Sequence, residues 1–238
     1  MRTILTFGFL LALTASAVAH TFSQEDFVCP LCTNRFSTFM DASGTQMGMR
    51  LDFKPLGPIA APWSVAVCPL CRFVLYQGAR GTYTKAEVKD LKAFVASPSY
   101  AGLPTNAPSY QRLALIREHL KQPSADIGWA WLQASWQVES GQNSGLCHQC
   151  LTNSARAFDA ALAVAKAGDK AYITAALLRG ELHRRLGEMK QAREWFQHLQ
   201  VEPAFKTNYF PRLIRQQLSL IATGNTAPQN LESSRDEK

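Results

Sequence analysis

The chain has 238 residues, of which 47% are hydrophobic and 18% are charged, and its formal net charge is +7. This length accommodates one large or two small domains, and the hydrophobic content is sufficient to fill a core. The positive charge is moderate and forms no dense stripe of Lys and Arg, so the composition argues against a nucleic-acid-binding protein. We therefore expect a protein that folds by itself and has no nucleic-acid partner.

Residues 1–19 have the pattern of a secretory signal peptide. A short basic start precedes an almost unbroken apolar run over residues 4–13, and Ala17-Val18-Ala19 matches the small-x-small motif of a cleavage site. The run is too short to cross a membrane, and no later stretch reaches the ~18 apolar residues of a spanning helix. We expect cleavage after Ala19 and an exported mature protein without a membrane span, in a bacterial periplasm.

Two nearly identical Cys-x-x-Cys motifs are the most specific feature of the chain. Cys29-Pro30-Leu31-Cys32 is hook 1, and Cys68-Pro69-Leu70-Cys71 is hook 2. Two such turns can face each other and close a tetrahedral shell of four thiolates around Zn²⁺. Residues 33–67 make a longer spacer than a compact zinc finger has, so strands and loops must lie between the hooks. The predicted zinc ligands are Cys29, Cys32, Cys68 and Cys71.

Disulfides are the alternative to zinc at the two hooks. An exported protein meets an oxidising compartment, and the chain has an even number of cysteines, 6 in all. The four hook thiols could then pair within each hook or between the hooks. The spacing and the repetition of the motif favour zinc, but the sequence leaves both possibilities open.

Residues 20–97 are predicted to form a small zinc-ribbon-like β domain with a trailing helix. Residues 20–26 are interpreted as a polar lead-in to hook 1. Alternating apolar residues predict strands over 47–53, over 63–67 before hook 2 and over 72–76 after it. A strand, a cysteine turn and a second strand in succession are typical of a zinc ribbon.

After residue 83 the spacing of the apolar residues changes from two to three or four, which predicts the start of helical structure. Thr84 and Glu87 are spaced as a capping box, which predicts a helix that ends near Ser97. Residues 98–108 contain three prolines and a glycine, so they are predicted to be a linker and the domain boundary.

Residues 109–223 are predicted to form an α-helical domain, and residues 224–238 a polar, disordered tail. Ser124 is the expected N-cap of the second helix in this domain. Apolar residues at a period of three to four mark six helices, around Leu113, Leu132, Leu162, Leu178, Phe196 and Ile214. The predicted fold class is therefore α+β, with a β domain followed by a helical domain.

Residues 173–204 resemble one tetratricopeptide unit. Gly180 stands where two helices would pack closely, Gly187 at the turn, and Ala192 and Phe196 on the second helix. Because a solenoid normally needs three or more repeats, the preceding helices are predicted to be degenerate units. Paired helices of this kind form grooves that bind peptides or helices, which predicts a protein partner.

The two hooks, followed by the helical stretch GELHRRLG over residues 180–187, resemble a bacterial family known as domain of unknown function 2225. The resemblance covers roughly residues 27–200. It implies a zinc ribbon with a repeat-like helical tail, and no established reaction. Members often have glycine after each hook, where this chain has Thr33 and Arg72, and an exported leader is unusual among them.

A third cysteine pair, Cys147-His148-Gln149-Cys150, precedes a predicted helix. A thiol near a helix N-terminus is favoured as the thiolate, which is the placement that redox cysteines use. A structural disulfide between Cys147 and Cys150 is the preferred interpretation, because no thioredoxin-like βαβ pattern surrounds the motif. The alternative function that this pair suggests is a periplasmic thiol-disulfide or metal-handling protein.

A group of basic residues in the same region is interpreted as a solvated helical face. Glu181, four residues before Arg185, would form an ordinary ion pair on that helix. The basic residues are Arg179, Arg184, Arg185, Lys190 and Arg193.

The sequence gives no support for an enzyme. It contains no G-x-S-x-G, no H-E-x-x-H and no phosphate-binding glycine loop. We therefore predict an exported, zinc-binding scaffold or assembly protein that engages a protein partner through its helical domain.

Overall fold

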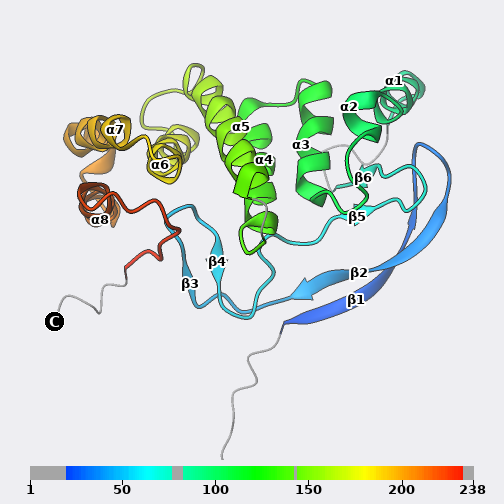
Figure 1. The fold of residues 1–238 in the computed structure, drawn as a ribbon, viewed down its shortest axis with the longest axis horizontal. Coiled ribbons are helices and arrows are strands. Elements are labelled where there is room, and N and C mark those ends of the chain that lie inside the picture. Colours follow the sequence, from blue (N-terminus) through cyan, green and yellow to red (C-terminus); the bar gives the residue numbers. More distant parts are fainter. Residues whose placement is uncertain (1–19, 77–82, 142–143, 233–238) are drawn as a thin grey trace, which may run out of the picture.

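The computed structural model describes residues 20–76, 83–141 and 144–232, so the predicted signal peptide lies outside the described residues. The architecture is α+β, as predicted: short antiparallel hairpins precede a series of helices (Figure 1). The strands pair as β1 with β2, β3 with β4 and β5 with β6. Their bounds are β1 (Thr21–Val28), β2 (Arg35–Ser43), β3 (Gly48–Met49), β4 (Pro55–Leu56), β5 (Ala66–Val67) and β6 (Val74–Leu75).

The helices form a row, and the strands lie along one side of it (Figure 1). From α3 to α8, each helix packs against the next one in the chain. Their bounds are α1 (Lys85–Val95), α2 (Pro98–Ala101), α3 (Ser109–His119), α4 (Ser124–Val138), α5 (Ser144–Leu162), α6 (Lys170–Arg185), α7 (Met189–Val201) and α8 (Phe210–Ala222).

Helix α1 begins where the capping box predicts. The Thr84 hydroxyl accepts from the Glu87 N–H at 3.2 Å, and the Thr84 N–H donates to a Glu87 carboxylate oxygen at 2.8 Å. The expected cap of α4 is wrong by one residue, because Pro123 is the N-cap and the Ser124 side chain makes no capping hydrogen bond. Pro123 has an extended backbone (φ −52°, ψ 134°), and Ser124 is already helical.

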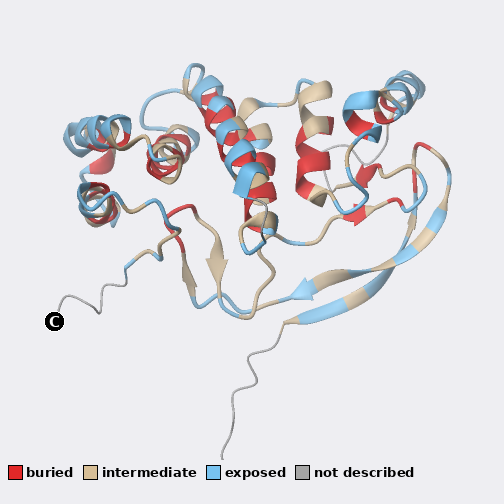
Figure 2. Cartoon of the chain, viewed as in Figure 1, coloured by how far each residue is buried: buried red, intermediate tan, exposed pale blue. Residues whose placement is uncertain are grey.

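The expected polar lead-in to hook 1 is a strand instead. Strand β1 pairs with β2 along its whole length, with Phe27 opposite Phe36 and their rings stacked at 5.7 Å. The hairpin runs along the strand side of the molecule, and its residues are exposed or intermediate (Figure 2). Since no residue of β1 is buried, the strand lacks the apolar alternation by which a half-buried strand is recognised.

The predicted linker at 98–108 is a packed connection in the structure. Its first residues form α2, where Tyr100 is fully buried and its hydroxyl donates to the Arg72 carbonyl at 2.7 Å. One hydrophobic cluster contains Cys29 and Cys68 together with Leu113 of α3. The core around the hooks therefore continues into the helices on the far side of this connection.

Helices α6 and α7 approach closely at Gly180, as predicted. A Cβ at this position would lie 2.5 Å from Phe196 Cζ, so only glycine fits without displacement. Gly187 has φ +80° at the turn between the helices, a conformation that favours glycine. The assignment of this pair to a tetratricopeptide repeat stays a prediction.

Two of the arginines predicted to lie on a solvated face are buried. Arg184 is fully buried and pairs with Glu181 on the same helix at 2.7 Å, while Gln217 of α8 also contacts it. Arg185, 4% exposed, does not pair with Glu181 but reaches Asp52 at 3.3 Å and Glu139 at 2.9 Å. The expectation failed because other acceptors lie far away in the sequence: Gln217 for Arg184, and Asp52 and Glu139 for Arg185.

Four charged side chains form what we call the ion cluster: Arg50, Asp52, Glu139 and Arg185. Arg50 donates to both carboxylates, and Trp136 Nε1 donates to Asp52 at 2.9 Å. The cluster joins the turn between β3 and β4 to the end of α4 and the end of α6. Ion pairs that are buried and hydrogen-bonded on several sides fix one relative placement of the elements that carry them.

Part of the predicted disordered tail is bound to the body. The N–H of Leu51 donates to Gln229 O at 2.9 Å, and the N–H of Leu231 donates to Met49 O at 2.9 Å. Arg184 also donates to Ala227 O at 2.9 Å. Residues 225–232, which we call the C-terminal segment, therefore connect β3 with α6. Polar composition suggested disorder, but the C-terminal segment makes these contacts through its backbone N–H and C=O groups, which do not depend on side-chain polarity.

Candidate metal centre

The two hooks have the same backbone structure, and each lies between the strands of a hairpin. In hook 1, between β1 and β2, the Thr33 N–H donates to Cys29 O at 2.9 Å and the Cys29 N–H donates to Asn34 O at 2.9 Å. In hook 2, between β5 and β6, the equivalent bonds run from Arg72 to Cys68 and from Cys68 to Phe73, both at 2.9 Å. The repeated Cys-Pro-Leu-Cys motif thus forms the same turn twice.

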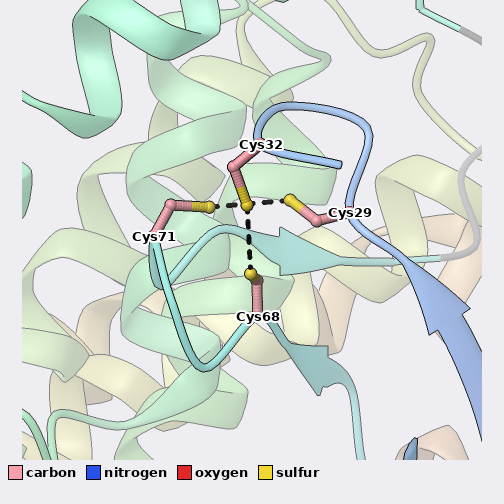
Figure 3. Close-up of side chains that lie close together, drawn as sticks. All are labelled: Cys29, Cys32, Cys68 and Cys71. Atoms are coloured by element: carbon pink, nitrogen blue, oxygen red, sulfur yellow. Dashed lines mark hydrogen bonds between the residues drawn. The ribbon is translucent and has the colours of Figure 1, made fainter. Parts of the chain in front are cut away.

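The four hook thiols converge on one point. Their Sγ atoms all lie within 4.8 Å of one another, with Cys29 and Cys71 at 3.6 Å and Cys32 and Cys68 at 3.5 Å (Figure 3). A tetrahedral site with metal–sulfur bonds of about 2.3 Å has sulfur–sulfur edges of about 3.8 Å, whereas a disulfide bond is about 2.05 Å long. All four are free thiols in the structure. The separations therefore suit a shared metal ion.

The electrostatics of the cluster also favour a cation. Burial raises the pKa of Cys71, and the neighbouring thiols raise it further. Burial also acts to raise the pKa of Cys68, but N–H groups of Cys71 and Leu70 donate to its sulfur and lower the pKa to about 7. One of the four thiols can thus lose its proton readily, but burial and the neighbouring thiols make the loss of further protons unfavourable. A divalent cation at the centre would remove this opposition, because it stabilises every thiolate around it.

The centre is partly enclosed. Cys29 and Cys68 are fully buried, while Cys32 and Cys71 are half-buried and line a cavity of about 360 Å³ together with Val95 of α1. A set of four sulfur donors in tetrahedral geometry is typical of zinc or iron–sulfur sites. Among the residues that the structure describes, these four make the one group of metal-ligating side chains of this kind.

Comparison with known proteins places the chain in a family. The family described as "uncharacterized protein conserved in bacteria (DUF2225)" matches residues 22–221. The chain belongs to DUF2225. No curated protein and no solved structure matches it. The match spans both hooks and α1 to α7 in full, so the four-cysteine cluster and nearly all of the helical row of this DUF2225 protein lie within the family region.

Each hook of this DUF2225 protein is followed by a residue with a strained backbone. Thr33 has φ 61° and Arg72 has φ 63°, which is the left-handed region that favours glycine. Both residues carry a Cβ, so each turn holds a conformation that glycine would adopt at lower cost.

Cys147 and Cys150 lie apart from the metal centre, in the first two turns of α5. Both are free thiols, Cys147 half-buried and Cys150 fully buried. Burial raises the pKa of Cys147 despite the nearby Arg185, and it raises the pKa of Cys150 to about 12. The expected lowering of a thiol pKa at the helix start is therefore wrong, because burial outweighs the helix dipole here. A disulfide between the two stays a prediction.

No helix in the described part of this DUF2225 protein has the length and apolar character needed to cross a lipid bilayer.

Proposed function

We propose that this protein is an exported zinc-binding scaffold or assembly factor that engages a protein partner through its helical domain. The observation that carries the proposal is the convergence of four sulfur atoms, from two turns of the same structure, within 4.8 Å of one another. Export rests on the apolar leader of residues 1–19, and Zn²⁺ rests on the four-sulfur donor set, which this ion prefers in structural sites.

The zinc would act as a structural ion. Four cysteine ligands fill a tetrahedral shell and leave no position for a water or a substrate, whereas catalytic zinc sites keep one position open. The centre also lies where two hairpins meet the helices, since Cys29 and Cys68 share a cluster with Leu113 of α3. Metal binding would therefore fasten both hooks to each other and to the helical row.

The helical row supports the partner-binding part of the proposal. On one side, the row is covered by the chain's own strands and C-terminal segment (Figure 1). Large apolar side chains are exposed in the connections of the row: Val164 after α5, Val201 at the end of α7 and Tyr209 before α8. The three residues belong to two connections, α5–α6 and α7–α8. We assign the partner-binding surface to these two connections.

Metal analysis of the protein from its exported compartment, purified without reductant, tests the zinc site. We expect one zinc ion per chain and protection of the four hook thiols from alkylation. Cys32→Ser should lose the ion, whereas the matched Cys147→Ser should keep it. Absence of metal together with absence of free hook thiols would overturn the zinc proposal in favour of disulfides.

The Cys147–Cys150 pair distinguishes the scaffold from a thiol-disulfide protein. Replacing both by serine should leave zinc binding and partner binding intact and cause no loss of function. Loss of a thiol-exchange activity in this double variant, with the fold retained, would instead support the redox alternative. The raised pKa values of both thiols give no support for that alternative.

Affinity capture with paired baits tests the partner-binding surface. The partner should bind the wild type and be lost with the V164D/V201D variant, while a Phe39→Asp control at an exposed residue of β2 retains it. A partner that binds all three baits equally would contradict the placement of the surface.

A further inference from the structure

A cavity of about 580 Å³ lies between the β1–β2 hairpin and helix α3. Glu25, Phe27 and Met40 line it from the hairpin, and Tyr110 and Arg117 line it from α3. Trp63 contributes to the wall from the segment that leads into β5. Neither the metal centre nor the proposed partner surface uses any of these residues.

The hairpin is held at a fixed place beside this cavity. Asp41 of β2 accepts from the Ser64 N–H at 2.6 Å, and the Asp41 N–H donates to the Ser64 hydroxyl at 2.9 Å. Hook 1 anchors the other end of the hairpin to the metal centre. The hairpin is therefore held at two points, and Glu25, Phe27 and Met40 between them line the cavity.

Two opposite charges line the cavity without forming a salt bridge. Arg117 donates to the Asp126 carbonyl at 2.6 Å and lies 5.3 Å from the centre of the Tyr76 ring, but its buried Nε has no hydrogen-bond partner. Among the described residues, the Glu25 carboxylate has one hydrogen bond, from the Ser23 hydroxyl at 3.3 Å, and neither Glu25 nor Arg117 pairs with an opposite charge. The Nε atom of Arg117 is closed to solvent and Nη1 is engaged, so Nη2 is the guanidinium nitrogen that a ligand can reach. This nitrogen and the carboxylate belong to residues that line the same cavity.

Aromatic rings form much of the cavity wall. Trp63, Tyr76 and Tyr110 line the cavity together with Phe27. The Tyr110 hydroxyl is engaged, since it donates to the Trp63 carbonyl at 2.9 Å, so its position is fixed. Small-molecule sites commonly have this composition: apolar and aromatic walls, a few placed polar groups and a volume of several hundred Å³.

We propose that this cavity binds a small zwitterion with an apolar side chain, either a free amino acid or a di- or tripeptide. Arg117 binds the carboxylate, for which the guanidinium geometry is suited. Glu25 binds the ammonium group, and the aromatic walls surround the apolar side chain. The ligand site shares no residue with the four hook cysteines or with the partner surface, so its failure would leave the proposed function intact.

Titration calorimetry on the full metal-loaded protein tests the site with L-phenylalanine and with the dipeptide Ala-Phe. Binding of the amino acid identifies a free amino acid as the ligand, and binding of the dipeptide alone identifies a peptide. N-acetylation of the bound probe removes the charge for Glu25, and amidation of its carboxylate removes the charge for Arg117. Each change should weaken binding by about ten- to a hundredfold, as expected for a lost charge-assisted hydrogen bond.

Protein variants provide the second arm of the test. Arg117→Gln should abolish the preference for the free carboxylate, and Glu25→Gln should abolish the preference for the free ammonium. Lys89→Gln makes the same charge change as Arg117→Gln on the exposed surface of α1 and should have no effect. Failure of both probes to bind at millimolar concentration, or equal binding of the charged and blocked forms, would overturn the proposal. Because the blocked probes are tested on the wild type, this result does not depend on the folding of any variant.

Discussion

Thr33 and Arg72 adopt the same left-handed backbone, with φ 61° and φ 63°, one residue after the last cysteine of each hook. A residue with a Cβ is strained in this region by about 1–2 kcal/mol. Thr33→Gly should therefore stabilise the protein by about 0.5–1 kcal/mol, after allowance for the greater entropy of glycine in the unfolded chain. Urea denaturation of the metal-loaded protein measures this. Thr33→Ala is the matched control, since it keeps the strain and should give no gain.

Breaking the ion cluster should be costly. Arg185→Met leaves the carboxylates of Asp52 and Glu139 with fewer partners in a site that is largely closed to solvent. Removing one partner from a buried ion pair typically costs about 3–5 kcal/mol. Denaturant titration should show a loss of this size, whereas Arg193→Met, at an exposed position of α7, should change stability little. Equal effects of the two substitutions would contradict the assigned role of the cluster.

The ion cluster also predicts a dependence of stability on pH. Burial alone would raise the pKa of Glu139, but the hydrogen bond and charge of Arg50, with Arg185 and Lys54, lower it from 4.5 to about 2. A carboxylate with a lowered pKa stabilises the folded state above its usual pKa, because the unfolded chain binds the proton more tightly. This contribution to the free energy of unfolding is fully present above pH 4.5 and is lost as the pH falls towards 2.

Comparison of the wild type with Glu139→Gln measures this contribution. The difference in unfolding free energy should be constant above pH 5 and should shrink as the pH falls below about 4.5. Acid also removes metal from thiolate ligands, but it does so in both proteins, so the difference isolates the carboxylate. A difference that grows on acidification would contradict the lowered pKa.

Removal of the C-terminal segment should destabilise the protein. A chain that ends at Gly224 lacks the carbonyls of Asn225 and Ala227, which accept from the fully buried Arg184. Leaving hydrogen-bond donors of a buried charged group unsatisfied costs about 1–3 kcal/mol or more. We expect a loss of at least this size by thermal or urea unfolding. A chain that ends at Glu232 keeps the whole segment and should match the full-length protein.

The elements that could be predicted from the sequence are those that carry their own local signal. The hooks were recognisable because each places two cysteines at a spacing that itself forms the turn. Helix α1 was recognisable from Thr84 and Glu87, and the close contact of α6 with α7 from Gly180. In each case the residues that decide the structure lie on one element or on two that follow one another in the chain.

The features that were missed depend on partners far away in the sequence. Arg184 and Arg185 follow a pattern that is typical of a solvated helical face, and the acceptors that bury Arg185, Asp52 and Glu139, lie in other elements. Strand β1 has no buried face, so periodicity could not reveal it. The charges of Glu25 and Arg117 meet at one cavity only because the hairpin lies beside α3. Long-range pairing of this kind leaves no local pattern.

The pairing of residues 49–51 with residues 229–231 has a consequence for the order of folding. These segments lie far apart in the chain, so their contact forms only after the intervening elements have brought them together. Strand β3 lacks its outer neighbour, and Arg184 lacks two acceptors, until the helices between the two segments have packed. The contact that fastens the C-terminal segment is therefore a late step of folding.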